Sequence, residues 1–205
     1  MQEKRGLFVV LEGIDGSGKT TQLQKTAKYL FNKSKYNHIL ATREPYKSRE
    51  TREILRQDSD PYAKARKLAE LFVQDRKEHV DEIILPALKK GLYIISDRYK
   101  YSTIVYQSVQ GIPLQELIEM HKGMLVPDLT LIFDVPVKTA MQRMKNDERR
   151  EQKFESNRGF QEKLRQRYLE LPKIFPDENI IIIDGEKSKE CIEKEIMGIL
   201  DKELF

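Results

Sequence analysis

The sequence predicts an α/β protein in which a five-stranded parallel sheet carries helices on both faces. Three observations predict it: five short apolar runs, longer segments with helical spacing between them, and a glycine-rich motif directly after the first run. The runs are continuous instead of alternating, which is typical of strands covered on both faces. Because strands and helices alternate along the chain, parallel pairing with crossover helices is favoured.

The elements follow one another in a regular order. Between the second and third runs, apolar residues recur at helical intervals from Leu68 to Leu88, and Pro86 is expected to kink or break that helix. The final segment, 188–204, is expected to be a helix because its isoleucines fall on one face. The expected strands are LFVVL (7–11), HILAT (38–42), LYIIS (92–96), LTLIFDV (129–135) and IIIID (180–184).

The composition limits the class of protein. The 205 residues suffice for a single domain over 1–205 with a real core. Charged residues make up 34% of the chain, and no apolar run approaches the ~18 residues of a membrane span. Lys and Arg exceed Asp and Glu by 37 to 33, but the charges are scattered and do not indicate nucleic acid. Cys191 is the one cysteine and cannot form an internal disulfide, which favours a cytoplasmic location.

One stretch differs from the rest of the chain. Residues 145–158, KNDERREQKFESNR, hold almost no apolar residue beyond Phe154 and alternate in charge sign. Charge runs are usually solvated helix-loop-helix segments. Because this run lies between two helical patterns, it is also a candidate for a short mobile lid.

The first run leads into GIDGSGKT at 13–20, which matches the phosphate-binding pattern G-x-x-x-x-G-K-[ST] between a strand and a helix. In such a loop the backbone N–H groups turn toward nucleotide phosphates, Lys19 reaches the terminal oxygens, and Thr20 offers a hydroxyl to Mg²⁺. The motif predicts the P-loop NTPase fold. The ATP-binding residues predicted here are Gly13, Ile14, Asp15, Gly16, Ser17, Gly18, Lys19 and Thr20.

The P-loop alone leaves the activity open, since switch GTPases, helicases, transporters and nucleotide kinases share it. A switch GTPase is disfavoured because the chain has no N-K-x-D base-reading motif and no D-x-x-G after the early strands. The second substrate must therefore be inferred from other residues.

In an open parallel sheet, ligands bind beyond the carboxyl ends of the strands. Arginines there suit bidentate capture of phosphate, although a lone arginine is usually only a surface residue. Asp97 could hold Mg²⁺ beside the P-loop threonine, cap the next helix, or do both. The residues that follow the second and third runs are Arg43, Glu44, Arg49, Arg52, Arg56, Asp97 and Arg98.

A base-binding wall is indicated by Phe72 and Arg76, which share a helical face four residues apart. A ring could stack on a base while the guanidinium bonds its edge, but the spacing alone favours core packing for Phe72. Tyr99, Tyr106 and Gln107 raise a similar possibility, because an amide can bond the amide-like edge of a base.

Together these residues resemble the thymidylate kinase family, P-loop enzymes that phosphorylate dTMP to dTDP. The similar segments span nearly the whole chain, and they occur in the family's order. They are LEGIDGSGKTTQ (11–22), TREP (42–45), LFVQDRKEH (71–79), ILPALKKG (84–91), DRYKYSTIVYQ (97–107), PDLTLIFDVP (127–136) and FQEKLRQRYLEL (160–171).

The resemblance implies roles at the base and sugar of dTMP. Phe72 would stack on thymine, and Arg76 would bond its edge. Thr103 and Gln107 would make further polar contacts to the base, while Tyr106 would line the deoxyribose.

The resemblance also implies roles near the phosphates. Asp15 would recognise the 3′-hydroxyl beside the transferring phosphoryl. Arg98 and Arg52 would hold the dTMP phosphate, with Arg43 and Glu44 in the same wall. The loop from Pro45 to Arg52 lacks the family's usual glycines, so Arg49, Arg52 and Arg56 remain alternatives for this contact.

On the ATP side, Arg143 resembles the residue beside the adenine, and the turn at Asp184 and Gly185 would close that pocket. One branch of the family carries a catalytic arginine where this chain has Gly16. The charge is therefore expected from the lid, where the alternatives are Arg149 and Arg150.

The predicted function is phosphorylation of dTMP by Mg-ATP, with Asp15, Lys19, Arg98 and a lid arginine as catalytic residues and Thr20 and Asp97 on Mg²⁺. His38, His79 and His121 are assigned no role, because a phosphate acceptor needs no strong base. The alternatives are a related kinase of another nucleoside monophosphate or nucleoside, and a nucleotide-dependent binding module. The family suggests a homodimer.

Overall fold

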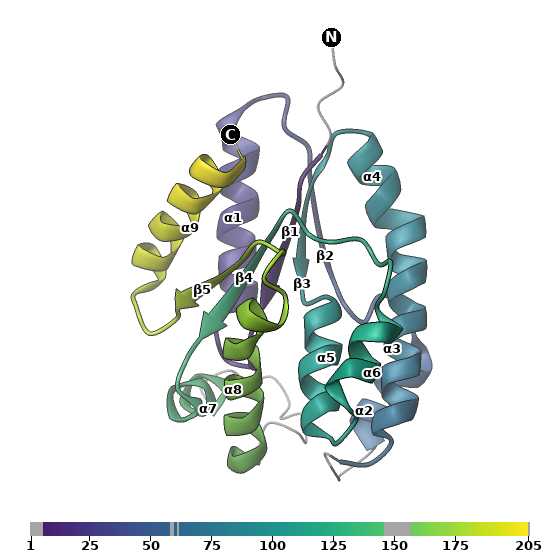
Figure 1. Ribbon diagram of the computed structural model, residues 1–205. Helices are drawn as coiled ribbons and strands as arrows, with labels where there is room; N and C mark the ends of the chain where they lie inside the picture. Colours follow the sequence, from purple (N-terminus) through teal and green to yellow (C-terminus); the bar gives the residue numbers. More distant parts are fainter. Residues whose placement is uncertain (1–5, 58–59, 61, 146–156, 205) are drawn as a thin grey trace.

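The computed structural model describes residues 6–57, 60, 62–145 and 157–204. Its centre is a sheet of five parallel strands in the order β2-β3-β1-β4-β5 (Figure 1). The predicted fold class is confirmed, and each predicted apolar run is a strand whose bounds agree within one residue. The strands are β1 (Phe8–Glu12), β2 (Ile39–Arg43), β3 (Tyr93–Asp97), β4 (Leu129–Asp134) and β5 (Ile180–Asp184).

Helices connect these strands and cover both faces of the sheet (Figure 1). No helix in the described ranges is long and apolar enough to cross a membrane. The helices are α1 (Lys19–Lys33), α2 (Arg49–Gln57), α3 (Ala65–His79), α4 (Leu85–Lys89), α5 (Lys100–Val109), α6 (Leu114–Met120), α7 (Val137–Lys145), α8 (Arg158–Ile174) and α9 (Lys189–Leu204).

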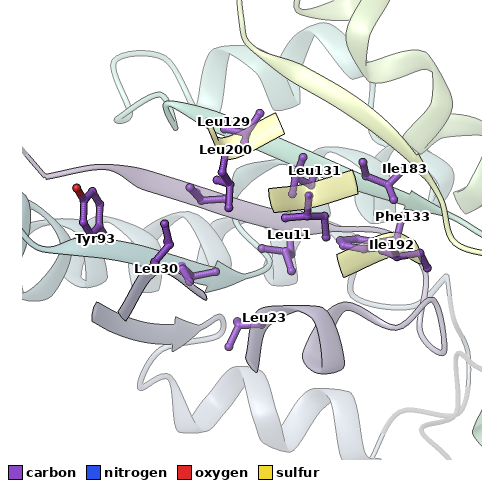
Figure 2. Close-up of a cluster of buried hydrophobic side chains, with 13 residues drawn as sticks. Leu11, Leu23, Leu30, Tyr93, Leu129, Leu131, Phe133, Ile183, Ile192 and Leu200 are labelled. Carbon is purple, nitrogen blue, oxygen red and sulfur yellow. The ribbon is translucent and has the colours of Figure 1, made fainter. Parts of the chain in front are cut away.

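Alternate residues of β1 face the two sides of the sheet, as the period of a strand requires. Val9 and Leu11 pack in the buried cluster formed with α1 and α9, which Figure 2 shows around Leu23, Leu30 and Ile192. Phe8 and Val10 instead pack against the helical segment that ends in α4. The sheet is thus held rigidly from both sides, and its carboxyl edge can position side chains for chemistry.

The prediction that every strand is covered on both faces is wrong for the two edge strands. β1 and β3 are buried throughout and β4 nearly so, whereas β2 has only half-buried and exposed residues and β5 has a single buried residue, Ile183. Their apolar sequences resemble those of the central strands, but β2 and β5 lie at the edges of the sheet and have a neighbouring strand on only one side.

Of the kink or local break predicted at Pro86, a full break does not occur, but the regular α-helical pattern is interrupted just before the proline. A π-helical turn at Val80–Ile84 joins α3 to α4, and the Leu85 N–H donates to the Val80 carbonyl, five residues earlier. Proline lacks an N–H and its ring clashes with the carbonyl of residue i−4 in a regular α-helix. The wider turn just before Pro86 accommodates the ring, so helical backbone continues from 65 to 89.

Candidate active site

The P-loop connects β1 to α1, and its backbone requires glycine. Gly13 has φ 137° and Gly16 has φ 79°, a region that residues with a Cβ rarely adopt. A Cβ on Gly16 would lie 2.4 Å from the Ala140 carbonyl oxygen of α7. The loop is therefore packed tightly against α7, and it leads directly into the N-terminus of α1, where a helix favours anions.

Lys19 is buried at the mouth of this loop. Its Nζ donates to the carbonyl oxygens of Gly13 and Ile14, both at 2.9 Å, and lies 3.9 Å from Asp15. Burial and the nearby charge of Arg98 lower the pKa of Lys19 to about 8, against the opposing attraction of Asp15. An arriving phosphate would place a further anion beside this ammonium.

The two residues predicted to hold a metal ion meet across the sheet. The Thr20 hydroxyl donates to Asp97 Oδ2 at 2.9 Å, although the two residues are 77 positions apart in the sequence. A hydroxyl and a carboxylate beside a phosphate site are oxygen ligands of the kind Mg²⁺ prefers. Asp97 also has Arg43 at 3.8 Å. The donor set therefore fits magnesium.

Arg98 lies directly after β3 and bonds to the P-loop. Its Nη2 contacts Asp15 Oδ1 at 2.5 Å, and the Tyr106 hydroxyl donates to the other carboxylate oxygen at 3.3 Å. Burial would raise the pKa of Asp15, but the charges of Arg98 and Lys19 outweigh it and lower that pKa. Burial raises the pKa of Tyr106, so its phenol remains a donor. Asp15 is therefore an anion held between two cations.

Arg76 forms a buried polar centre with Glu44. Its Nε donates to Glu44 Oε2 at 2.7 Å, and its Nη2 donates to the Tyr99 carbonyl at 3.1 Å and to Thr103 Oγ1 at 3.0 Å. The Arg76 side chain is 2% exposed. Within the described residues, the Glu44 carboxylate pairs with Arg76 and His79 and has no hydrogen bond or ion pair to the P-loop. Arg76 is therefore fixed in orientation before any ligand binds.

His121 completes this centre, although no role for it was predicted from the sequence. Its Nε2 lies 2.8 Å from Arg76 Nη1, and its Nδ1 lies 2.7 Å from the Leu117 carbonyl. Since a guanidinium only donates, Nε2 must accept and Nδ1 must carry the proton. Burial, and then the charge of Arg76, lower the pKa of His121 to about 3. This histidine is a neutral acceptor.

Phe72 and Gln107 both have side-chain groups that could still bind a ligand. Phe72 is half-buried, and the apolar clusters of the described residues do not include it, contrary to the core packing that its spacing favours. Gln107 is 2% exposed and lies one helical turn after Thr103. Its Nε2 donates to Gln110, but its buried Oε1 has no partner among the described residues. A donor on a ligand would satisfy that oxygen.

The loop after β2 is tied down by Asp75 of α3. This one carboxylate accepts from the backbone N–H groups of Tyr46, Lys47 and Ser48 at 2.5 to 2.8 Å. Arg52 of α2 turns back to the same loop and donates to the carbonyls of Pro45 and Tyr46. The Glu44–Pro45 peptide bond is cis. Arg52 is thus held close to the end of β2.

The predicted adenine side is also brought together. Arg143 of α7 donates to the Gly185 carbonyl at 2.9 Å, and Asp184 accepts from the Glu186 N–H at 3.0 Å. A Cβ on Gly185 would lie 2.4 Å from a Val135 methyl, so this turn packs closely against the end of β4. Most of the predicted lid lies outside the described residues, and so do both of its arginines, Arg149 and Arg150.

Comparison with known proteins places this constellation in one family. The family profile described as Thymidylate kinase matches residues 11–196. Pyrococcus horikoshii has a probable thymidylate kinase 39% identical over 207 residues, covering 98% of each chain. A probable thymidylate kinase of Thermococcus gammatolerans is 38% identical over 98% of each chain. The thymidylate kinase of Carboxydothermus hydrogenoformans is 36% identical over 96% of this chain and 98% of its own.

The chain belongs to the thymidylate kinase family. It is therefore an enzyme, a kinase with the P-loop fold, and the predicted phosphorylation of dTMP is supported over the alternative nucleotides and over a binding module. The resemblance seen in the sequence motifs is confirmed over nearly the full length.

Several residues of the candidate site in this thymidylate kinase received no role from the sequence. Their partners are distant in the sequence: His121 contacts Arg76, 45 positions away, and Glu12 contacts Tyr168, 156 positions away. A single sequence shows no pattern for such pairs, because each partner lies in an ordinary helix or strand. The residues missed are Glu12, Asp75, His79, His121 and Tyr168.

Proposed function

We propose that the rim formed by the P-loop, the ends of β2 and β3, and α5 transfers the γ-phosphoryl of ATP to the phosphate of dTMP. One observation carries this assignment: Asp15 of the P-loop is bonded to Arg98 at 2.5 Å. The loop that cradles a triphosphate and the arginine suited to a second phosphate are therefore adjacent. Two anionic groups bound at these points would meet end to end.

For the donor, the backbone of Gly13 to Thr20 would bind the phosphates, with Lys19 on the β and γ oxygens. Thr20 and Asp97 would hold Mg²⁺, which neutralises phosphate charge when bound. Arg143, beside the Gly185 turn, would flank the adenine. The bond between Arg143 and Gly185 supports this role because it fixes the guanidinium at that turn.

For the acceptor, Phe72 would stack on thymine. Gln107 Oε1, which has no partner among the described residues, would accept from the thymine N3–H. Arg76 uses four of its five N–H groups inside the described protein and would offer the remaining one to the O4 edge beside Thr103. Cytosine has an unprotonated N3 and an amino group in place of O4, so it would leave both groups unsatisfied.

The rest of the acceptor would lie nearer the P-loop. Tyr106 would line the deoxyribose, and Asp15 would accept from the 3′-hydroxyl. Arg98 and Arg52 would bind the phosphate, with the exposed Arg43 at the same edge. Glu44 would serve this site indirectly, since it is paired with Arg76 at 2.7 Å.

The chemistry needs positioning and charge more than proton transfer. A phosphate monoester with a second pKa near 6 is largely a dianion at neutral pH, so its oxygen can attack in line without a strong base. Lys19, Arg98 and either Arg149 or Arg150 of the lid, 145–158, would stabilise the charge on the transferring phosphoryl. An arginine in that position raises turnover by roughly 10³-fold or more in related chemistry.

An ADP-release assay with ATP, Mg²⁺ and a panel of monophosphates tests the proposal. dTMP should be the best acceptor and dCMP a poor one, because a site built for hydrogen bonds rejects an analogue that lacks them. Gln107→Ala should lower kcat/KM for dTMP about tenfold and leave the low dCMP value nearly unchanged. Gln74→Ala, an exposed glutamine of α3, is the matched control. Equal rates with dTMP and dCMP would contradict this assignment.

We further propose that the enzyme is a single-domain cytoplasmic protein that acts as a homodimer and needs neither nucleic acid nor a membrane. The family and the single cysteine support these features.

A further inference from the structure

A buried polar set lies behind Arg98, on the side away from the P-loop carboxylate. It consists of Glu12 at the end of β1, Ser102 on α5 and Tyr168 on α8, and we call these three residues the Arg98 cradle. Glu12 is 0% exposed and Tyr168 is 2% exposed. None of the three has been given a role in substrate binding above.

The cradle contacts Arg98 through two hydroxyl oxygens. Arg98 Nη1 donates to Ser102 Oγ at 2.9 Å and to the Tyr168 hydroxyl at 3.0 Å. Its other amino group, Nη2, is the one that binds Asp15. The two ends of the guanidinium therefore have different partners, and the cradle fixes the end that faces away from Asp15.

Glu12 determines which way these hydroxyls point. Its Oε2 accepts from Ser102 Oγ at 2.6 Å and from the Tyr168 hydroxyl at 3.2 Å, while its Oε1 accepts from the backbone N–H groups of Tyr99 and Ser102. An ionised carboxylate only accepts, so both hydroxyls can direct their protons to Glu12, and the two hydroxyl oxygens also lie 3.0 Å from each other. The oxygen lone pairs are then left for the two N–H groups of Arg98 Nη1, and every donor in the set has an acceptor.

The cradle also joins elements that are distant in sequence. Arg98 and Ser102 belong to one short stretch, but Tyr168 comes from α8, 70 residues beyond Arg98. Arg98 itself has φ 75°, an unusual value for a residue with a Cβ, and its N–H donates to the Leu11 carbonyl of β1. The orientation of Arg98 thus depends on how α8 docks on the sheet.

We propose that Tyr168 is a positioning residue for the phosphate-binding Arg98, holding its guanidinium from α8 through the hydroxyl that Glu12 orients. This inference rests on the proposed function, in which Arg98 binds the phosphate of dTMP. The hydroxyl of Tyr168 does not contact the substrate; it restricts Arg98 to the orientation that serves both Asp15 and the acceptor phosphate.

The test compares two phenol deletions. Tyr168→Phe removes the hydroxyl and keeps the ring, and it should lower kcat/KM for dTMP about tenfold while KM for ATP stays within about twofold. Tyr101→Phe is the matched control: Tyr101 is 0% exposed, and its hydroxyl also donates to a carboxylate, that of Glu178, away from Arg98. The control should lose stability without losing kcat/KM.

A second pair of variants establishes that the effect passes through Arg98. dTMP binding is measured by titration calorimetry in Arg98→Ala with and without Tyr168→Phe. The hydroxyl deletion should weaken binding about tenfold in the parent and have no further effect once Arg98 is absent. An effect of Tyr168→Phe no larger than that of Tyr101→Phe, or one that persists in Arg98→Ala, would overturn the proposal.

Different results would overturn the positioning role of Tyr168 and the proposed role of Arg98. A silent Tyr168→Phe beside an impaired Arg98→Ala overturns the positioning role alone. An Arg98→Ala variant that binds dTMP as tightly as the parent overturns the proposed role of Arg98, and the positioning role with it.

Discussion

At the scale of single residues, His121 shows how a buried cation can be oriented without a second charge. Glu44 already supplies the negative partner of Arg76, at 2.7 Å. A further carboxylate beside it would need its own counter-ion in this buried region, whereas a neutral imidazole accepts one more bond from Arg76 at little electrostatic cost. The Leu117 carbonyl selects the tautomer that makes this possible.

This arrangement predicts a pH-dependent loss of stability. Folding lowers the pKa of His121 from 6.5 to about 3, so between these values the unfolded chain binds a proton that the native state does not. Stability contributed by this site is therefore complete above pH 6.5 and declines as the pH falls toward 3. The free energy of unfolding should fall by up to about 1.4 kcal/mol per pH unit from this residue.

Urea unfolding from about pH 8 down to about pH 5 measures that slope. His121→Gln should flatten the profile, because glutamine accepts from Arg76 without titrating. His38→Gln changes an exposed histidine and should leave the slope as in the parent. Parallel profiles for the parent and His121→Gln would show that His121 is not held neutral in the folded protein.

At the scale of elements, α3 positions the acceptor side of the site in two ways. Arg76 on this helix forms the polar centre under the base site, and Asp75 next to it binds three consecutive N–H groups of the loop after β2. Adjacent helical residues point about 100° apart, so one helix can serve both the base pocket and the loop. The position of Arg52, which donates to that loop, follows from the Asp75 bonds.

Asp75→Asn should therefore weaken dTMP binding through the loop. The amide keeps one acceptor oxygen but turns an NH₂ group toward backbone donors, which loses bonds to a charged group and should raise KM for dTMP about tenfold. KM for ATP should stay unchanged, because no Asp75 contact reaches the P-loop among the described residues. Asp81→Asn, exposed on the π-helical turn, is the control. Steady-state kinetics with each substrate varied would decide the matter, and equal changes in both KM values would argue against a local effect.

The elements also show which features of the fold can be predicted from the sequence and which cannot. Each strand was found because a continuous apolar run is a local signal, and the P-loop because its glycines are fixed by a local backbone shape. The π-helical turn before Pro86 and the exposure of β5 depend on what lies beside those segments. A run such as IIIID has the same sequence pattern whether its strand lies at the centre or at the edge of a sheet.

At the scale of the whole molecule, the site is a property of the sheet edge. Residues from β1, β3, α1, α3, α5 and α8 meet there because parallel strands all end on the same side. The motifs predicted that Thr20 and Asp97 would lie together, and they do, at 2.9 Å. The contacts that orient Arg98 and Arg76 could not be predicted. Glu12 and Tyr168 lie in segments that resemble the family but received no role there, His121 lies in none of these segments, and the contacts of His121 and Tyr168 form only through the packing of α6 and α8.

This shared edge predicts how the two nucleotides affect the stability of the protein. A ligand at 100 times its Kd stabilises the native state by about 2.7 kcal/mol, and about 1 kcal/mol shifts the Tm of a chain of this size by roughly 2–4 °C. A non-hydrolysable ATP analogue and dTMP occupy different residues of the edge, so their shifts should add when both are present. Differential scanning fluorimetry with each ligand and with the pair tests this, with dCMP as the matched control. If dTMP produced no shift beyond that of the saturating analogue, the two would be competing for the P-loop, and a separate acceptor site around Phe72, Arg76 and Gln107 would be excluded.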